Sequence, residues 1–149
     1  MSVVKKYPCY IRGVEQKYPN VTPGTPIYAN AVTVDNLIFV SGMTAQDPAT
    51  GGCLTNTIQD QMWVAMTKLK ATLEAAGSSM DNLVRTLIML KDVKDYPVMR
   101  ATELKFYEQY APSLIDKPCG STFLQPGALA RPEFLVEIEA IAVVKKDEE

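Results

Sequence analysis

A run of small and polar residues, KPCGSTFLQ at positions 117–125, leads into a segment typical of a β-strand. It carries the thiol of Cys119, the hydroxyls of Ser121 and Thr122, and Gly120, whose backbone N–H a ligand can approach closely. The chain has no histidine, which excludes His-based triads and histidine-ligated zinc. Any proton transfer must therefore come from carboxylates, Lys, Tyr, Cys or a backbone-held water. The run either lines a ligand site or is only a turn before the last strands.

Cys119 is a conceivable nucleophile, but no imidazole is present to activate it, so a packed free thiol is the favoured interpretation. The three cysteines, Cys9, Cys53 and Cys119, are odd in number and far apart, which argues against a disulfide framework and fits a reducing compartment. No apolar run approaches the ~20 residues that span a bilayer, and the N-terminus has no apolar core of signal-peptide length. We expect a cytoplasmic protein with no membrane partner.

The elements that must position these residues fit one domain over residues 1–149, because 149 residues with 47% hydrophobic content can bury a core. Residues 1–26 predict an irregular arm with one short strand at CYIRGV, and 145–149 a charged tail. From residue 27 the pattern predicts strands and helices in the order ββαβαββ. Asp35 begins a two-residue hairpin turn, Thr57 caps the first helix, Gly77 ends it, and Asp95 caps the second helix.

Two helices can cover only one face of a mixed sheet, yet the predicted strands carry apolar residues on both sides. The strand within NLVRTLIMLKDV is the clearest case, since it is nearly all apolar from Leu87 to Leu90. Something has to cover the second face, so we expect the chain to form oligomers through it.

Several blocks of the chain, in order, resemble the Rid/YjgF reactive-intermediate deaminase family, which is also called L-PSP endoribonuclease-like. They are YANAV, FVSGMTAQDPATG, LEAAGSSMDNLVRTLIMLKDVKDYPVMRATELKFYEQY, KPCGST and FLVEIEAIAVV. The resemblance implies an α+β, chorismate-mutase-like fold with two helices on one face of a mixed sheet, and a homotrimer whose sheets form a barrel. It further implies small-molecule clefts between subunits, hydrolysis of 2-imino or enamino acids to 2-keto acids and ammonia, and no metal or organic cofactor.

The chain departs from this family at its carboxylate-binding arginine. The family motif is Pro-Ala-Arg-Ser/Thr, and this chain has Pro118-Cys119-Gly120-Ser121-Thr122, with Gly120 at the arginine position. Arginine grips a carboxylate through a bidentate pair that a neutral donor cannot reproduce. We expect Gly120, Ser121 and Thr122 to line the cleft with Cys119 beside them among the substrate-binding residues, and a neutral or bulkier substrate in place of the usual 2-imino acids.

The resemblance assigns roles to four further residues. Glu137 holds the attacking water, Tyr28 contacts the ligand, and the Gly42 backbone lies against it. Arg100 lies where relatives often carry asparagine near the cleft, and could supply a guanidinium from another direction. Each has a simpler interpretation: a solvent-facing strand residue for Glu137, a half-buried aromatic for Tyr28, a bulge for Gly42 and a solvated helix residue for Arg100.

Three functions remain open at this stage. The leading one is a Rid/YjgF-like hydrolase or deaminase acting on an imine, enamine or related intermediate. The second is a trimer that binds a metabolite without turnover. The third is an endoribonuclease or translation inhibitor, against which count the 15 basic and 17 acidic residues, a net charge of −2, because nucleic-acid binding depends on a positive field.

Overall fold

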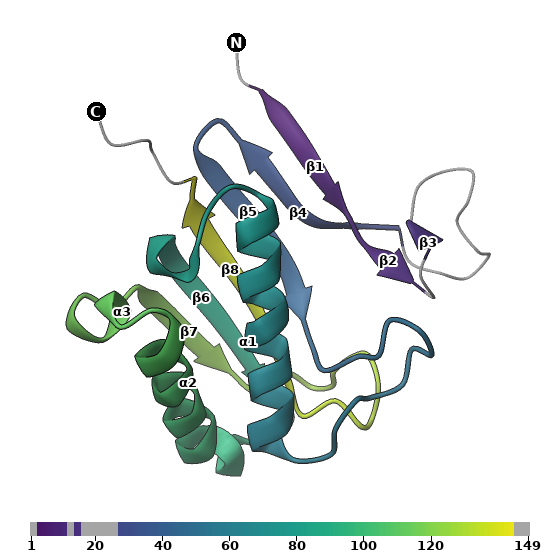
Figure 1. The fold of residues 1–149 in the computed structure, drawn as a ribbon. Helices are drawn as coiled ribbons and strands as arrows, with labels where there is room; N and C mark the ends of the chain where they lie inside the picture. Colours follow the sequence, from purple (N-terminus) through teal and green to yellow (C-terminus); the bar gives the residue numbers. More distant parts are fainter. Residues whose placement is uncertain (1–2, 12–13, 16–26, 145–149) are drawn as a thin grey trace.

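The computed structural model describes residues 3–11, 14–15 and 27–144, and the expected charged tail at 145–149 lies outside them. A six-stranded sheet in the order β1-β4-β5-β8-β6-β7 forms the body of the molecule (Figure 1). Its strands are β1 (Val4–Pro8), β4 (Ala29–Val34), β5 (Leu37–Met43), β6 (Leu83–Leu90), β7 (Gly120–Leu124) and β8 (Val136–Val143). Only β6 and β7 run parallel, and the other neighbours are antiparallel. The expected order ββαβαββ is confirmed from residue 27 onward.

Two long helices lie side by side over one face of this sheet (Figure 1). They are α1 (Ile58–Ala75) and α2 (Tyr96–Tyr110), accompanied by the short α3 (Ser113–Asp116) and the 3₁₀ turns η1 (Met80–Asn82) and η2 (Val93–Asp95). The Thr57 hydroxyl accepts from the Asp60 N–H at 3.2 Å, as its predicted capping role requires. Gly77 follows α1 at a φ of +82°, a value that favours glycine at a helix end. Asp95 precedes α2 as expected, but its side chain makes no capping hydrogen bond.

The N-terminal arm was expected to be irregular, and its described part contains an additional edge strand. β1 pairs antiparallel with β4, from Val4 opposite Val34 to Pro8 opposite Ala29. The expected short strand at CYIRGV corresponds to two small paired strands, β2 (Tyr10–Ile11) and β3 (Val14–Glu15). Pro8 sits at the end of an edge strand, where a missing N–H is tolerated.

The two faces of the sheet differ sharply in cover. Under the helices, Ile38, Ile88 and Ile138 are at most 1% exposed and pack with the apolar stripe of α1. On the other face, Leu37 and Phe39 are 42% and 43% exposed. Because side chains alternate along a strand, every strand contributes to both faces. We call the uncovered side the open face, and it leaves apolar side chains in contact with solvent in a single chain.

Candidate functional site

Three of the expected site residues line one cleft of about 650 Å³. Tyr28 lies just before β4, Gly42 lies in β5 where its register with β8 shifts, and Glu137 lies near the start of β8. Cys9 and Ser41 also line this space. Ser41 donates to the Ala29 carbonyl at 2.6 Å and Cys9 donates to the Tyr28 carbonyl at 3.3 Å, which ties the segment around Tyr28 to its neighbours. We call this space the Glu137 cleft.

Gly42 is in close contact with the Glu137 carboxylate. A Cβ atom at position 42 would lie 2.8 Å from Glu137 Cδ and 3.1 Å from Oε1, closer than such atoms approach in proteins. The irregular register of β5 and β8 at this point brings the glycine backbone against the carboxylate. Glycine therefore leaves the space in which the carboxylate lies.

The cleft changes the acidity of two of its side chains. Burial raises the pKa of Glu137, and the neighbouring Glu139 carboxylate adds to this effect. Burial also raises the pKa of Tyr28, with smaller contributions from Cys9 and Glu137. A carboxyl group with a raised pKa is better matched to taking up and returning a proton near neutral pH, and the Tyr28 hydroxyl stays protonated there.

The residues of the KPCGSTFLQ run divide between the two faces of β7. Cys119 and Phe123 pack against the core under the helices, and the hydroxyl of buried Thr86 donates to Ser121 Oγ at 3.0 Å. Gly120 and Thr122 alternate with them and therefore lie on the open face. Burial raises the pKa of Cys119, so its interpretation as a packed thiol holds. Cys119 and Ser121 do not reach the Glu137 cleft in this chain.

Arg100 is occupied by partners within its own chain. Its Nη1 donates to both carboxylate oxygens of Glu103, at 2.9 and 3.1 Å, and its Nη2 donates to Ser121 Oγ at 3.1 Å. Its Nε donates to the Tyr96 hydroxyl at 3.2 Å. The guanidinium joins α2 to the helix side of β7 and does not line the Glu137 cleft. The structure therefore supports a structural role for Arg100.

Gly120 and Glu137 are far apart within one chain. Glu137 is paired in register with Met89 of β6, and Met89 with Leu124 of β7, whereas Gly120 is paired with Arg85. Two strand spacings and four residues along the sheet separate the two positions by about 16 Å. A single chain therefore does not form the expected pocket from Gly120, Thr122 and Glu137.

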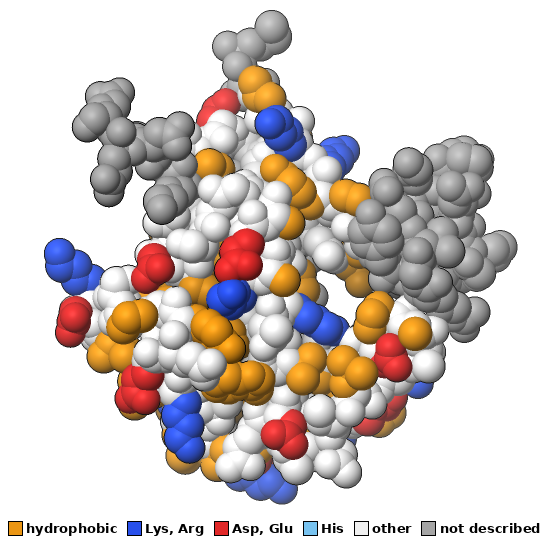
Figure 2. Space-filling view, viewed as in Figure 1, with side chains coloured by type: hydrophobic (Ala, Val, Ile, Leu, Met, Phe, Trp, Pro, Cys, Tyr) orange, Lys and Arg blue, Asp and Glu red, His pale blue; other side chains and the backbone are white. Residues whose placement is uncertain are grey.

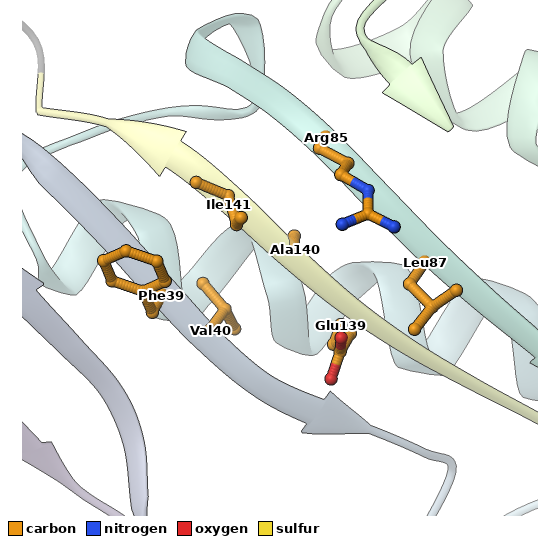
Figure 3. Close-up of a pocket in the computed structure, with 7 residues that line it drawn as sticks. All are labelled: Phe39, Val40, Arg85, Leu87, Glu139, Ala140 and Ile141. Atoms are coloured by element: carbon orange, nitrogen blue, oxygen red, sulfur yellow. The ribbon is translucent and has the colours of Figure 1, made fainter. Parts of the chain in front are cut away.

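Two cations near these positions were not identified from the sequence. Lys68 of α1 lines the Glu137 cleft and donates to the Gln46 carbonyl, and burial lowers its pKa. Arg85 of β6 lines a smaller cavity of about 160 Å³ on the open face, with Phe39, Leu87 and Glu139 among its neighbours (Figure 3). In the sequence, Arg85 is a charged residue inside an otherwise apolar predicted strand. The hydrophobic periodicity alone does not show what such a residue does.

Two features are absent from the part of the chain that the structure describes. Among residues 3–11, 14–15 and 27–144, no group of three or more His, Cys, Asp or Glu side chains could hold a metal ion. In the same residues, no helix has the length and apolar character needed to cross a membrane.

Comparisons with known proteins agree with this fold. The family model described as Endoribonuclease L-PSP matches residues 22–144. The chain is 34% identical over 116 residues to the 2-iminobutanoate/2-iminopropanoate deaminase of Bos taurus, which covers 78% of this chain and 79% of that protein. It is 30% identical over 115 residues to a RutC family protein of Pyrococcus horikoshii, covering 77% and 85%. The crystal structure of the YjgF gene product from E. coli superposes with a TM-score of 0.71 at 27% identity, covering 83% of this chain and 91% of that one.

Proposed function

Since the chain belongs to the endoribonuclease L-PSP family, the Rid/YjgF family that its sequence resembles, we propose that it hydrolyses the C=N bond of an imine, including an imine formed from its enamine tautomer. Relatives at about 30% identity that are named 2-iminobutanoate/2-iminopropanoate deaminases support a deaminase-like function at the level of the family. The observation that carries the proposal is the Glu137 carboxylate, held against Gly42 with a raised pKa in a cleft that Tyr28 also lines.

The chemistry needs a water molecule, a base and a donor. Glu137 orients the water and takes a proton from it as the oxygen attacks the C=N carbon. The resulting carbinolamine carries both OH and NH₂ on that carbon. With the imine nitrogen protonated, this addition leaves one proton on Glu137, which returns it to the nitrogen. As the C–N bond breaks, the Glu137 carboxylate takes the hydroxyl proton, so a neutral carbonyl product and ammonia leave, and the proton then passes to ammonia to give ammonium. The protonated Tyr28 hydroxyl can donate to the nitrogen or to the attacking oxygen during these steps.

The cleft is completed in this proposal by a second copy of the chain. The open face carries exposed Leu37 and Phe39, and Leu124 on the edge strand β7 is 38% exposed. A homotrimer would cover these side chains and bring Gly120 and Thr122 of one copy toward the Glu137 cleft of the next. Light scattering at micromolar concentration tests this assembly, and a monomer there would remove both the trimer and the shared cleft.

The residue at position 120 sets the substrate preference. Without an arginine there, the short 2-imino acids lose a charge-assisted bidentate contact, which is worth on the order of ten- to a hundred-fold in binding. The test is ammonia release from imines that an amino-acid oxidase generates in the assay, with an arginine-bearing relative as the reference. We expect slow turnover of 2-iminobutanoate and 2-iminopropanoate. Rates equal to those of the reference would contradict this preference.

A trimer that binds a metabolite without turnover is the second candidate, and the glycine at position 120 is the observation that favours it. Calorimetric binding of a keto acid without ammonia release from any imine would support this candidate over the hydrolase. Nucleic-acid binding is disfavoured, because the described Lys and Arg side chains are interspersed with Asp and Glu on the face that Figure 2 shows, and the chain carries a net charge of −2.

A further inference from the structure

Arg85 is the direct neighbour of the position at which the family arginine is missing. Arg85 on β6 and Gly120 on β7 are partners in a parallel register. Their Cα atoms are therefore about 4.8 Å apart and both positions face the same side of the sheet. That side is the open face, because Thr86, the next residue, is 2% exposed under the helices. A guanidinium thus lies on the open face one strand further from the edge than a side chain at position 120.

The Arg85 side chain extends toward β7. Its Nη2 donates to Thr122 Oγ1 at 3.4 Å, a long contact, and within the described part of the chain no other side-chain hydrogen bond involves this guanidinium. The ion pairs between described residues join Lys70 to Glu74, Lys94 to Asp92, Arg100 to Glu103 and Arg131 to Glu133, so none of these uses Arg85. Figure 3 shows Arg85 and Glu139 on the same cavity, with Leu87 beside them. Glu139 is the nearby carboxylate with which an anionic ligand would compete.

Nothing in the fold requires glycine at position 120. The glycines with positive φ among the described residues are Gly51 and Gly77, so Gly120 has a backbone conformation open to other residues. An added Cβ would meet only the Val84 carbonyl oxygen, at 3.5 Å, which is an ordinary contact. The glycine leaves open space on β7, on the same face as Arg85 and one strand over, and a ligand group can enter that space.

We propose that Arg85 binds an anionic group of the substrate, in place of a guanidinium at position 120. This inference rests on the proposed function for the identity of the substrate as an imine. In the proposed trimer the reacting carbon lies at the Glu137 cleft of a neighbouring copy, beyond the β7 edge. Because Arg85 lies one strand further from that edge than position 120, the anion it binds lies further from the reacting carbon. The substrate class is therefore an imine with a carboxylate on its distal end, rather than a short 2-imino acid whose only carboxylate adjoins the C=N bond.

Calorimetric titration of the full chain with keto acids tests the site. The probes are 2-oxoglutarate, which carries a distal carboxylate, and 2-oxohexanoate, which has a similar length and a neutral tail. We expect the wild type to bind 2-oxoglutarate at least about ten-fold more tightly. Arg85→Met should remove that preference and leave the affinity for 2-oxohexanoate unchanged. Arg85→Lys should keep the charge and lose part of the preference, since it lacks the planar fork.

Two further variants should each strengthen the binding of one keto acid. Glu139→Gln removes the competing carboxylate, so 2-oxoglutarate should bind more tightly. The double variant Arg85→Met/Gly120→Arg returns the guanidinium to the edge strand, so it should bind 2-oxobutyrate better than the wild type does. Light scattering on each variant confirms that its assembly is that of the wild type.

The outcomes separate this inference from the proposed function. If the wild type releases ammonia from imines but Arg85→Met leaves its 2-oxoglutarate affinity unchanged, the role of Arg85 is wrong and the hydrolase stands. If Arg85→Met abolishes the preference while no imine is hydrolysed, the anion site stands and the hydrolase fails. A wild type that binds neither keto acid overturns the Arg85 site.

Discussion

The two faces of the sheet are made by the same strands but have different roles. Residues that point toward α1 and α2, such as Ile88 and Ile138, are at most 1% exposed and make the core. Residues that alternate with these buried ones along the strands point to the open face and include Arg85, Glu137 and Glu139. Strand alternation thus separates the groups that stabilise the fold from the groups that can bind or react. Substitutions at neighbouring positions should therefore have effects of different kinds.

The largest expected effect is on turnover. Glu137→Gln should lower the rate of imine hydrolysis by about 10²- to 10⁴-fold, because it removes the base that takes the proton from water. The oligomeric state and the melting temperature should change little, since the substitution conserves volume. Steady-state ammonia release measures the rate.

Glu139→Gln is the matched control for this variant. It makes the same chemical change two residues along the same strand and on the same face, but Glu139 has no assigned proton transfer. With a saturating substrate that has a neutral tail, its kcat should stay within a few-fold of the wild type, about 1 kcal/mol or less in the barrier. A Glu137→Gln protein that retains native turnover would show that the site assignment is wrong.

The next prediction compares substitutions at two adjacent residues of β6, Leu87 and Ile88. Ile88→Ala should lower the free energy of unfolding by about 2–5 kcal/mol, because Ile88 is fully buried under the helices. Leu87→Ala, on the open face, should instead weaken association between chains. Urea unfolding at several protein concentrations distinguishes them, since a loss of association depends on concentration. Equal, concentration-independent losses would contradict a difference between the faces.

Much of the fold was predictable because its signals are local. Thr57 and Gly77 mark the ends of α1 within a few residues of sequence, and the hairpin turn at Asp35, with its φ of +52°, is equally local. β1 was missed because Pro8 reads as a breaker and the pairing of Val4 with Val34 is long-range. An edge strand of mixed polarity carries little periodic signal of its own.

The site was only partly predictable, because sequence order does not give strand order. Glu137 follows Gly120 by a short distance in the chain, yet β8 inserts between β5 and β6 while β7 lies outside β6 at the edge. This arrangement joins Glu137 to Gly42 and Tyr28 and separates it from Gly120. The same nonlocal pairing places Arg85 next to Gly120, which their positions in the sequence do not indicate.

A smaller effect is expected from Gly42→Ala. The added Cβ would lie 2.8 Å from Glu137 Cδ, so the carboxylate must move. A displacement on the order of 1 Å can cost up to about 10²-fold in rate, so we expect a loss smaller than that of Glu137→Gln. Gly127→Ala is the control, since an added Cβ there meets nothing within 4 Å. Unchanged kinetics in Gly42→Ala would mean that the position of the carboxylate is not critical.

The smallest expected effect is the pH dependence of stability that Glu137 contributes. Burial, and then Glu139, raise the pKa of Glu137 in the folded state, so the folded protein binds this proton more tightly than the unfolded chain does. The resulting stabilisation is fully present below the ordinary glutamate pKa of about 4.3 and is lost as pH rises through the raised value.

The Glu137→Gln variant tests this dependence. It has no carboxyl group at position 137 that could ionise, so it does not lose this stabilisation as the pH rises. Relative to the wild type, its melting temperature should be higher at pH 7 than at pH 4. Calorimetric melting at the two pH values measures the difference, and Glu139→Gln, which removes the second cause, should shrink the contribution of Glu137. A relative gain for Glu137→Gln at pH 4 instead would mean that the folded state stabilises the charged carboxylate, which would contradict its burial in the cleft.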